Sequence, residues 1–587
     1  MRSRGKTLLV LLLVLAALAL VVLVSIYVLF DSKPVAFGKT VLEVDLTRSY
    51  PDHVPEEAFA RWLFDSRLRL RRLVETLERA GRDEDVVALV ARVGAVPMGL
   101  ATVQELRDAL QVFRQSGKKM VAYADTLGEW GPSNGAYYLA SVFDELYIQP
   151  SGDVGLSGLR YEVPFAAETL DKLGLEPQLD RRHEYKNAVN TYTETGFTEP
   201  HREAMQTLVD SQFEQLVTGI ASGRELAPER VRELFDDGPY FGVEALEAGL
   251  VDGVAYRDEV YEALEEELGD DVSFAELAGY ARRPLGSFER GSTVAVIYGV
   301  GAVVRGESQY DPFSGMLMGS ETVSEAFRDA VEDPSVEAIL FRVDSPGGSY
   351  VASDTIWREV LQARGAGKPV VVSMGNVAAS GGYFVAMSAD RIVAQPGTIT
   401  GSIGVYGGKI VSRKMWEKLG VSWGAVETSA NSQMWSSIEE FGDRGWDRMQ
   451  VSLDRIYDDF VAKVADGRGL PREQVEEIAK GRIWTGQSAL ELGLVDALGG
   501  YPTALAEVRD VLGLAEDANL RLKAYPRPRS TLELFLDRFP GVGRNSTSGL
   551  VARLLEVAQR LGPALRHLGL VEDRQMPLRA PEVEEMQ

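Results

Sequence analysis

The chain of 587 residues is 45% apolar and 25% charged, which is the composition of folded globular protein at a length that allows several domains. Aspartate and glutamate outnumber lysine and arginine by 87 to 62, and the formal charge of -25 argues against a nucleic-acid partner because an acidic surface repels phosphate. The chain has no cysteine and only four histidines, none at a metal-ligand spacing, so it offers no disulfide, no thiolate nucleophile and no expected metal or other cofactor.

The first predicted element is a membrane-spanning helix. Residues Leu8–Phe30 form a 23-residue apolar run interrupted only by Ser25, which is long enough to cross a hydrocarbon core of about 30 Å. Arg2, Arg4 and Lys6 precede the run, so the N-terminus is expected in the cytoplasm and the bulk of the chain outside it. A cleaved signal peptide is the alternative, but its apolar region has only about 7 to 15 residues, and no A-x-A pattern follows the run here. We therefore predict a retained anchor within residues 1–30.

The sequence after this anchor contains an internal repeat. Gly135–Ala140 reads GAYYLA, and Gly381–Ala386 reads GGYFVA 246 positions later. Gly242–Asp252 and Gly486–Asp496 match in the same order at an offset of 244. Because chance similarity would not keep its order and offset over such a distance, we predict two related domains.

Composition suggests the limits of these domains. A stretch with proline, glycine and serine at 282–287 is typical of a linker, so we predict domains over 31–285 and 286–524. A tail over 525–587 follows, in which the repeat ends and an apolar helical pattern lies near 550–561.

The second copy shows how each domain is built. Apolar residues recur at helical spacing over 323–331, and short apolar runs at 338–343, 369–374 and 391–394 are typical of buried strands. A helical pattern over 381–389 lies between the last two runs. Strands that alternate with helices predict an α/β fold with largely parallel pairing.

A glycine pair follows the first of these strands. Asp344–Ser349 reads DSPGGS, and two adjacent glycines allow a turn to present backbone N–H groups to a ligand because no Cβ obstructs the approach. Taken alone, such a loop is more often a simple turn.

Ser380 lies among small residues in Ala378–Gly382, between a strand and a helical pattern. A helix beginning just after it would direct N–H groups at a developing oxyanion, although a plain N-cap serine is the alternative interpretation. The segment is not a G-x-S-x-G elbow, since position 378 is alanine and no aspartate and then histidine follow in the expected order. Lysine can replace histidine as the base if burial lowers its pKa from about 10.4 towards neutrality.

The order D-S-P-G-G-S, A-A-S-G-G-Y and T-G-S-I-G-V, the last at 400–405, resembles the signal peptide peptidase A (protease IV) family in its long, double-domain form. The resemblance covers roughly residues 60 to 510. It implies two tandem Clp protease/crotonase-like domains after one N-terminal transmembrane helix, with a Ser-Lys dyad. The family's Tyr-Lys motif corresponds here to Tyr185-Lys186.

The repeat supports this choice of lysine independently. Asn134 occupies the position of Ser380, and Ser432 occupies that of Lys186, at the offset of 246. Each copy therefore keeps one member of the dyad, and a complete site needs both. The first copy also has Gly94–Pro97 in place of the D-S-P-G sequence, so its oxyanion loop is expected to be lost. The alternative is that Lys186 is an ordinary surface lysine.

The resemblance implies roles for six residues: Ser380 as nucleophile, Lys186 as general base, Gly347 or Gly348 with Gly381 as oxyanion donors, and Ser402 as the residue that positions the lysine. It also implies a serine endopeptidase of the inner (cytoplasmic) membrane, single-pass, with its catalytic domains in the periplasm. The expected partners are cleaved signal peptides or other apolar peptides, the membrane through residues 8–30, and further copies of the chain in a homotetramer.

Two other functions are compatible with the same pattern. Paired-glycine oxyanion loops on this fold also bind thioester carbonyls, so a crotonase-type acyl-CoA enzyme is one alternative. A non-catalytic membrane scaffold is the other. The division of serine and lysine between the copies favours the peptidase.

Overall fold

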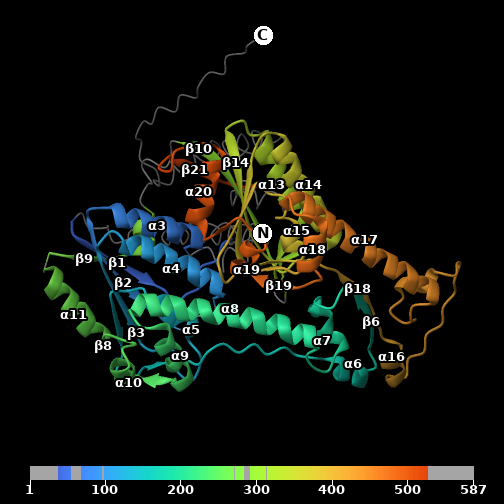
Figure 1. Ribbon diagram of the computed structural model, residues 1–587, viewed down its shortest axis with the longest axis horizontal. Coiled ribbons are helices and arrows are strands. Elements are labelled where there is room, and N and C mark those ends of the chain that lie inside the picture. Colours follow the sequence, from blue (N-terminus) through green and yellow to red (C-terminus); the bar gives the residue numbers. More distant parts are fainter. Residues whose placement is uncertain are drawn as a thin grey trace, which may run out of the picture. The chain divides into compact units, whose positions relative to one another are not determined.

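The computed structural model describes residues 38–53, 68–94, 98–269, 271–282, 291–311 and 314–526 (Figure 1). The predicted anchor at Leu8–Phe30, most of the predicted linker and the tail beyond 526 lie outside these residues. None of the helices within the described ranges is both long and apolar enough to span a membrane. We refer to the described residues up to 282 as the first half and to those from 291 as the second half; the predicted domain limits stay predictions.

The first half is built on a six-stranded parallel sheet. Its central strands, VVALVAR at 86–92 and KMVAYA at 119–124, read as nearly continuous apolar runs, as is typical of parallel strands buried on both faces. The strands, in spatial order, are β8 (Gly253–Val254), β4 (Glu145–Ile148), β3 (Lys119–Ala124), β2 (Val86–Arg92), β1 (Thr40–Asp45) and β9 (Ser273–Glu276).

The second half repeats this strand order. Two further strands, β17 (Ile399–Gly401) and β19 (Ile483–Thr485), extend the sheet beside β15, and their counterparts β5 (Asp153–Val154) and β7 (Tyr240–Phe241) pair apart from the first sheet. The corresponding strands are β20 (Ala497–Leu498), β16 (Arg391–Ala394), β15 (Val370–Ala379), β14 (Val336–Ser345), β10 (Ser292–Val300) and β21 (Leu520–Tyr525).

Helices follow one another in the same order in both halves. In the first half the main helices are α3 (Leu70–Arg82), α4 (Leu100–Arg114), α5 (Asn134–Ala140), α8 (Glu199–Arg224), α9 (Pro228–Asp237), α10 (Gly242–Glu247) and α11 (Arg257–Leu268). Their counterparts are α13 (Ser320–Glu332), α14 (Tyr350–Gly365), α15 (Gly381–Phe384), α17 (Asp443–Arg468), α18 (Arg472–Ile478), α19 (Gly486–Glu491) and α20 (Tyr501–Val511). The predicted α/β fold and duplication are therefore visible in matching elements.

Each sheet is covered on both faces. Side chains from α3, α4 and α5 form the larger core of the first half, and those of α11 cover the other face. In the second half α13, α14 and α17 cover one face and α20 covers the other. The sheets are thus the rigid frames from which the loops at their strand ends project.

Smaller elements connect these frames. Strands β11 (Ala302–Val304), β12 (Gln309–Asp311) and β13 (Gly315–Gly319) form one small sheet, and β6 (Glu176–Arg181) pairs with β18 (Tyr406–Val411) in another. The remaining short helices are α6 (Ala167–Leu173), α7 (Asn190–Thr193), α12 (Leu277–Ala281), α16 (Arg413–Lys418) and the 3-10 turns η1 (Asn187–Val189) and η3 (Ser432–Trp435).

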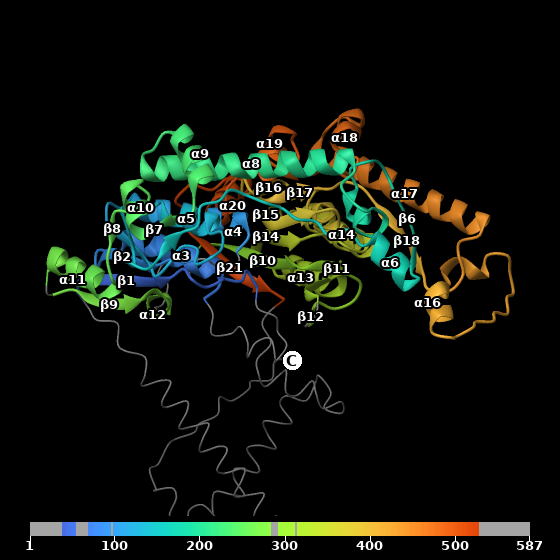
Figure 2. The ribbon, with the colours of Figure 1, turned by 90° about the horizontal axis from the view of Figure 1, so that it is seen from below.

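Helix α8 of the first half lies alongside elements of both halves (Figure 2). Ser211 Oγ lies 3.0 Å from Thr485 Oγ1, and the Gln212 and Gln215 side-chain amides donate to the carbonyls of Gly397 and Pro396. These polar contacts tie the first half to the end of β19 and to the loop that follows β16.

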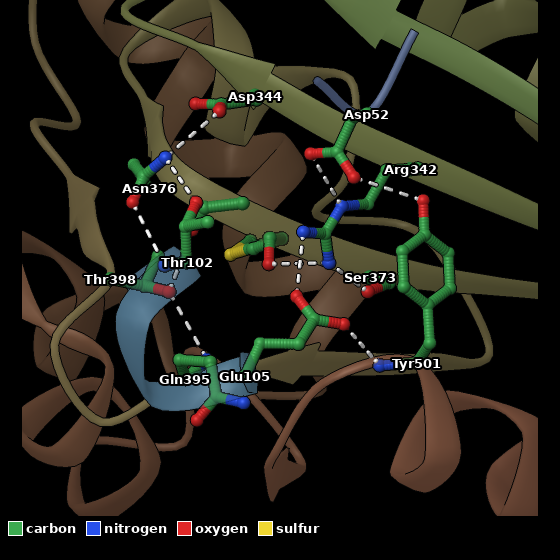
Figure 3. Close-up of polar contacts among 12 residues, drawn as sticks. Asp52, Thr102, Glu105, Arg342, Asp344, Ser373, Asn376, Gln395, Thr398 and Tyr501 are labelled. Atoms are coloured by element: carbon green, nitrogen blue, oxygen red, sulfur yellow. Dashed lines mark hydrogen bonds and ion pairs between the residues drawn. The ribbon is translucent and has the colours of Figure 1, made fainter. Parts of the chain in front are cut away.

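A buried ionic cluster also joins the two halves (Figure 3). Arg342 of β14 is fully buried, and its guanidinium pairs with Glu105 of α4 at 2.8 Å and with Asp52 at 3.1 Å, both from the first half. Tyr501 completes the cluster: its N–H donates to Glu105 at 2.6 Å, its hydroxyl donates to Asp52 at 3.1 Å, and its ring stacks on the guanidinium. Buried charges need such partners, so this cluster contributes, with the α8 contacts, to holding the two halves in place relative to each other.

Candidate active site

Ser380 lies where β15 ends and α15 begins. Its backbone has φ 54° and ψ −118°, a conformation that a residue with a side chain rarely adopts and that persists only where the surroundings enforce it. Its N–H donates to the Gly401 carbonyl at 2.9 Å, which holds the turn. Ser380 occupies the N-cap position of α15, but its side chain makes no capping hydrogen bond to the helix. Helix α15 ends at Phe384, so it is shorter than the pattern over 381–389 predicted.

Strand pairing between the halves determines where Lys186 lies. Strand β6 runs antiparallel to β18, so that Arg181 at the end of β6 pairs with Tyr406 at the start of β18. The residues that follow β6 and those that precede β18 therefore meet. Lys186 belongs to the first group and Ser402 to the second, which explains how side chains 216 positions apart come into contact.

The Lys186 amine has three oxygen neighbours. Its Nζ lies 3.0 Å from Ser380 Oγ, 3.0 Å from Ser402 Oγ and 2.8 Å from the Ser402 carbonyl oxygen. A neutral amine has two N–H donors and one lone pair, so it can donate twice to Ser402 and accept from the Ser380 hydroxyl. The arrangement is therefore suited to removing a proton from Ser380.

Burial changes the acidity of this amine. Lys186 is only 3% exposed, which contradicts the alternative that it is a surface lysine. Because a desolvated ammonium loses hydration that the neutral amine does not need, burial lowers the pKa of Lys186 to about 7. Ser380 itself is partly exposed. The site thus combines an accessible hydroxyl with a buried amine that is substantially unprotonated near neutral pH.

The glycine loop of DSPGGS packs against the start of α15. Val303 of β11 donates to the Gly347 carbonyl and accepts from the Ser349 N–H, so Gly348 between them presents its own N–H to the opposite side. The Gly347 N–H is already donated to Ser345 Oγ, at 3.1 Å. A methyl group built on Gly381 would lie 3.0 Å from the Gly348 nitrogen, so these two glycines lie close together.

The N–H groups of Gly348 and Gly381 have no acceptor among the described residues. Gly348 is exposed while Gly347 is buried. Of the three glycines predicted from the sequence, Gly348 and Gly381 thus have N–H groups available to a substrate oxygen beside Ser380.

The counterparts of Ser380 and Lys186 in the repeat, Asn134 in the first half and Ser432 in the second, form no comparable pair. Asn134 begins α5 and bridges the following loop, since its amide donates to the Gly158 carbonyl at 2.6 Å and accepts from the Ser157 N–H at 3.1 Å. Ser432 lies in η3 with its side chain exposed. The loop at 95–97, which was expected to have lost its oxyanion function, lies outside the described residues.

Sequence reasoning did not identify every residue around the site. Ser345, fully buried, fixes the glycine loop, and Gly481 packs against the backbone of Lys186. No motif marks Gly481, because its importance comes from a contact with a residue of the other half.

Comparison with known proteins supplies independent information. The model of peptidase family S49 matches two segments, 112–270 and 362–515; Lys186 lies in the first and Ser380 in the second. Serine protease SPPA, chloroplastic, of Arabidopsis thaliana is 30% identical over 82% of this chain and 71% of its own. Protease 4 of Salmonella typhi is 31% identical over 84% of this chain and 78% of its own. Protease 4 of Haemophilus influenzae is 31% identical over 70% of this chain and 67% of its own.

Proposed function

Because the chain belongs to peptidase family S49 and is a serine peptidase, we propose that Ser380 is its nucleophile and Lys186 its general base. The observation that carries this assignment is the 3.0 Å contact between Lys186 Nζ and Ser380 Oγ. Ser402 positions the amine through its hydroxyl and carbonyl oxygens.

The reaction proceeds through an acyl-enzyme. Ser380 Oγ attacks the peptide carbonyl carbon while its proton passes to Lys186 Nζ, and a tetrahedral intermediate forms. The C–N bond then breaks as Lys186 returns the proton to the leaving amine. Water attacks the ester by the same route, giving its proton to Lys186, and Ser380 recovers a proton as the new carboxylate leaves.

The N–H groups of Gly348 and Gly381 hold the oxyanion in this scheme. Their availability, and the donation of the Gly347 N–H to Ser345, favour Gly348 over Gly347 as the loop donor. Helix α15 has only four residues, so individual N–H groups rather than a long helix dipole provide the stabilisation. Loss of one such donor typically costs about 2.7 to 4 kcal/mol of transition-state stabilisation.

The dependence of kcat/KM on pH is expected to follow the lysine. Burial lowers the pKa of Lys186 to about 7, and the base form is the unprotonated amine, so activity rises with pH as the proton is lost. Hydrolysis should increase about tenfold per pH unit well below pH 7 and level off above it. Initial rates on a fluorogenic peptide from pH 5 to 9 measure this profile. A rate that still rises about tenfold per pH unit at pH 9, as expected for a hydrated lysine with a pKa of about 10.4, would contradict the assignment.

The substrates in this proposal are cleaved signal peptides and other apolar, unfolded extracytoplasmic peptides. The apolar run at 8–30 supports a single-pass anchor in the inner (cytoplasmic) membrane, which would hold the periplasmic site near such peptides. The resemblance to signal peptide peptidase A and the parallel sheets support Clp protease/crotonase-like domains.

A homotetramer belongs to the same proposal. In the first half, the segment around Lys186 packs onto the second half. The matching segment of the second half instead presents exposed apolar side chains, with Leu419 at 68%, Trp423 at 50% and Trp435 at 67% exposure. Because the first-half segment covers the second half of its own chain, the matching second-half segment is expected to cover the first half of another copy.

Substrate preference tests the proposed function. The full chain is purified in detergent, its mass in solution is measured, and it is then given a synthetic signal peptide, a charged peptide of equal length and a folded protein. We expect the signal peptide to be cleaved at least about tenfold faster than the charged peptide, with the folded protein left intact. Equal cleavage of both peptides would contradict the substrate class. Turnover of acyl-CoA with no peptide cleavage would favour the crotonase alternative. Turnover of neither acyl-CoA nor peptide would favour the non-catalytic scaffold.

A further inference from the structure

The segment Lys480–Arg482 of the second half lies between Lys186 and the loop that carries Ser402. On one side, the Tyr185 N–H donates to the Lys480 carbonyl at 3.1 Å. On the other, the Ser402 N–H donates to the Arg482 carbonyl at 2.7 Å, and the Gly481 N–H donates to the Ile403 carbonyl at 2.8 Å. One short segment thus connects the residue before Lys186 to the residue whose oxygens contact its amine.

Gly481 is the point of closest approach. It has φ +80°, and a Cβ at this position would lie 2.6 Å from the N, Cα and Cβ atoms of Lys186. Backbone atoms cannot move aside as the end of a flexible side chain can, so any side chain here must displace Lys186. Glycine at 481 therefore allows the Lys186 backbone to lie directly against this segment.

The side chain of Arg482 connects the same segment to Tyr185 and to helix α8. Its guanidinium stacks between the rings of Tyr185 and Trp484, at 4.9 and 4.6 Å, and its Nη1 pairs with Glu203 of α8 at 2.9 Å. The Tyr185 hydroxyl donates to the other Glu203 oxygen at 2.7 Å. The residue next to Lys186 is thus tied to Arg482 both directly and through Glu203.

We propose that Lys480–Arg482 is a positioning element for the general base. Gly481 allows the Lys186 backbone to approach the Ser402 loop closely, and the ion pair of Arg482 with Glu203 holds the neighbouring Tyr185 in place. This inference rests on the proposed role of Lys186. The segment makes no hydrogen bond to Gly348 or Gly381 in the part of the chain that the structure describes, so we expect it to act on the rate of proton transfer rather than on binding.

Displacement of Lys186 has a recognisable kinetic signature. A misplacement of about 1 Å can cost about 100-fold in rate. An amine pushed out of its site also regains water, so its pKa rises and the pH midpoint of the activity moves upwards. KM should change little, because Ser380, Gly348 and Gly381 keep their positions.

The first test compares two alanine variants with matched backbone strain. Gly367 has φ +79° and open space around the position of a Cβ, so Gly367→Ala controls for strain alone. We expect Gly481→Ala in the full chain to lower kcat at least about 100-fold, with KM within about threefold and a higher pH midpoint. Gly367→Ala should have the kcat, KM and pH midpoint of the unmodified chain. A Gly481→Ala enzyme with the kcat and pH midpoint of the unmodified chain would overturn the inference.

Arg482 variants keep the inference testable if Gly481→Ala does not fold. Arg482→Met should lower kcat about tenfold and raise the pH midpoint, whereas Arg482→Lys, which can still pair with Glu203, should recover part of both. Arg472, in an exposed ion pair with Glu476, provides the control Arg472→Met, which should leave both unchanged. If Ser380→Ala and Lys186→Ala retain activity, the proposed function itself fails. If those two lose activity but Arg482→Met behaves as the control does, only the positioning role is rejected.

Discussion

Replacing Ser380 with alanine is expected to abolish peptide hydrolysis, and replacing Lys186 with methionine should have nearly the same effect. Members of a nucleophile–base pair act as a unit, and loss of one typically lowers kcat on the order of 10⁴- to 10⁶-fold. Methionine fills the space of the buried lysine stem without a titratable group, so the packing at this 3% exposed position is largely kept. Steady-state kinetics on a fluorogenic apolar peptide, with unmodified chain and both variants in parallel, measure the effect.

The repeat provides matched controls for this experiment. Ser432 is the counterpart of Lys186 in the other half and is exposed, so Ser432→Ala should retain full activity. The double variant Ser380→Ala with Lys186→Met should be no slower than either single variant, because the second substitution removes nothing that still functions. Retention of more than about a tenth of the activity in either single variant would mean that another nucleophile or base carries the reaction.

The second large effect concerns stability and the Arg342 cluster. Arg342→Met is expected to lower the free energy of unfolding by about 3–5 kcal/mol, because it leaves the buried carboxylates of Glu105 and Asp52 without their cation. Glu105 is 1% exposed, so water cannot take over this role. Urea-induced unfolding followed by circular dichroism measures the change.

An exposed ion pair is the matched control for Arg342. Arg230 is 45% exposed beside Glu233, and Arg230→Met should cost no more than about 1 kcal/mol. Adding Glu105→Gln to Arg342→Met should cost less than the sum of the single changes, since the second substitution removes one of the stranded charges. A loss below about 1 kcal/mol for Arg342→Met would show that the cluster does not hold the halves together.

Much of the architecture could be predicted from the sequence because it repeats. A strand such as β14, with the apolar run Ala338–Phe341 at its centre, is recognisable alone, and the two copies reinforce each other. The length of α15 could not be predicted, because apolar residues continue to Ala389 although the helix ends at Phe384. Burial beneath α14 and α17, rather than helical periodicity, accounts for those residues.

The pairing of Ser380 with Lys186 was predictable for the same reason, since each copy keeps one partner. The strained backbone of Ser380 and the use of the Gly347 N–H by Ser345 were not, because both depend on how loops fold against neighbouring elements. Contacts such as that between Arg342 and Asp52 join residues 290 positions apart, and a single sequence carries no local signal for them.

The division of the proposed dyad between the two halves also has a consequence in time. Lys186 is synthesised 194 residues before Ser380, which at about 5–20 residues per second is an interval of roughly 10–40 s. Until β18 arrives to pair with β6, the lysine lacks its burial and remains a hydrated, protonated ammonium. On the proposed assignment, a chain still emerging from the ribosome has a lysine that cannot yet accept a proton and has no Ser380 to activate. Proteolysis can therefore begin only after the second half has been synthesised and has packed against the first.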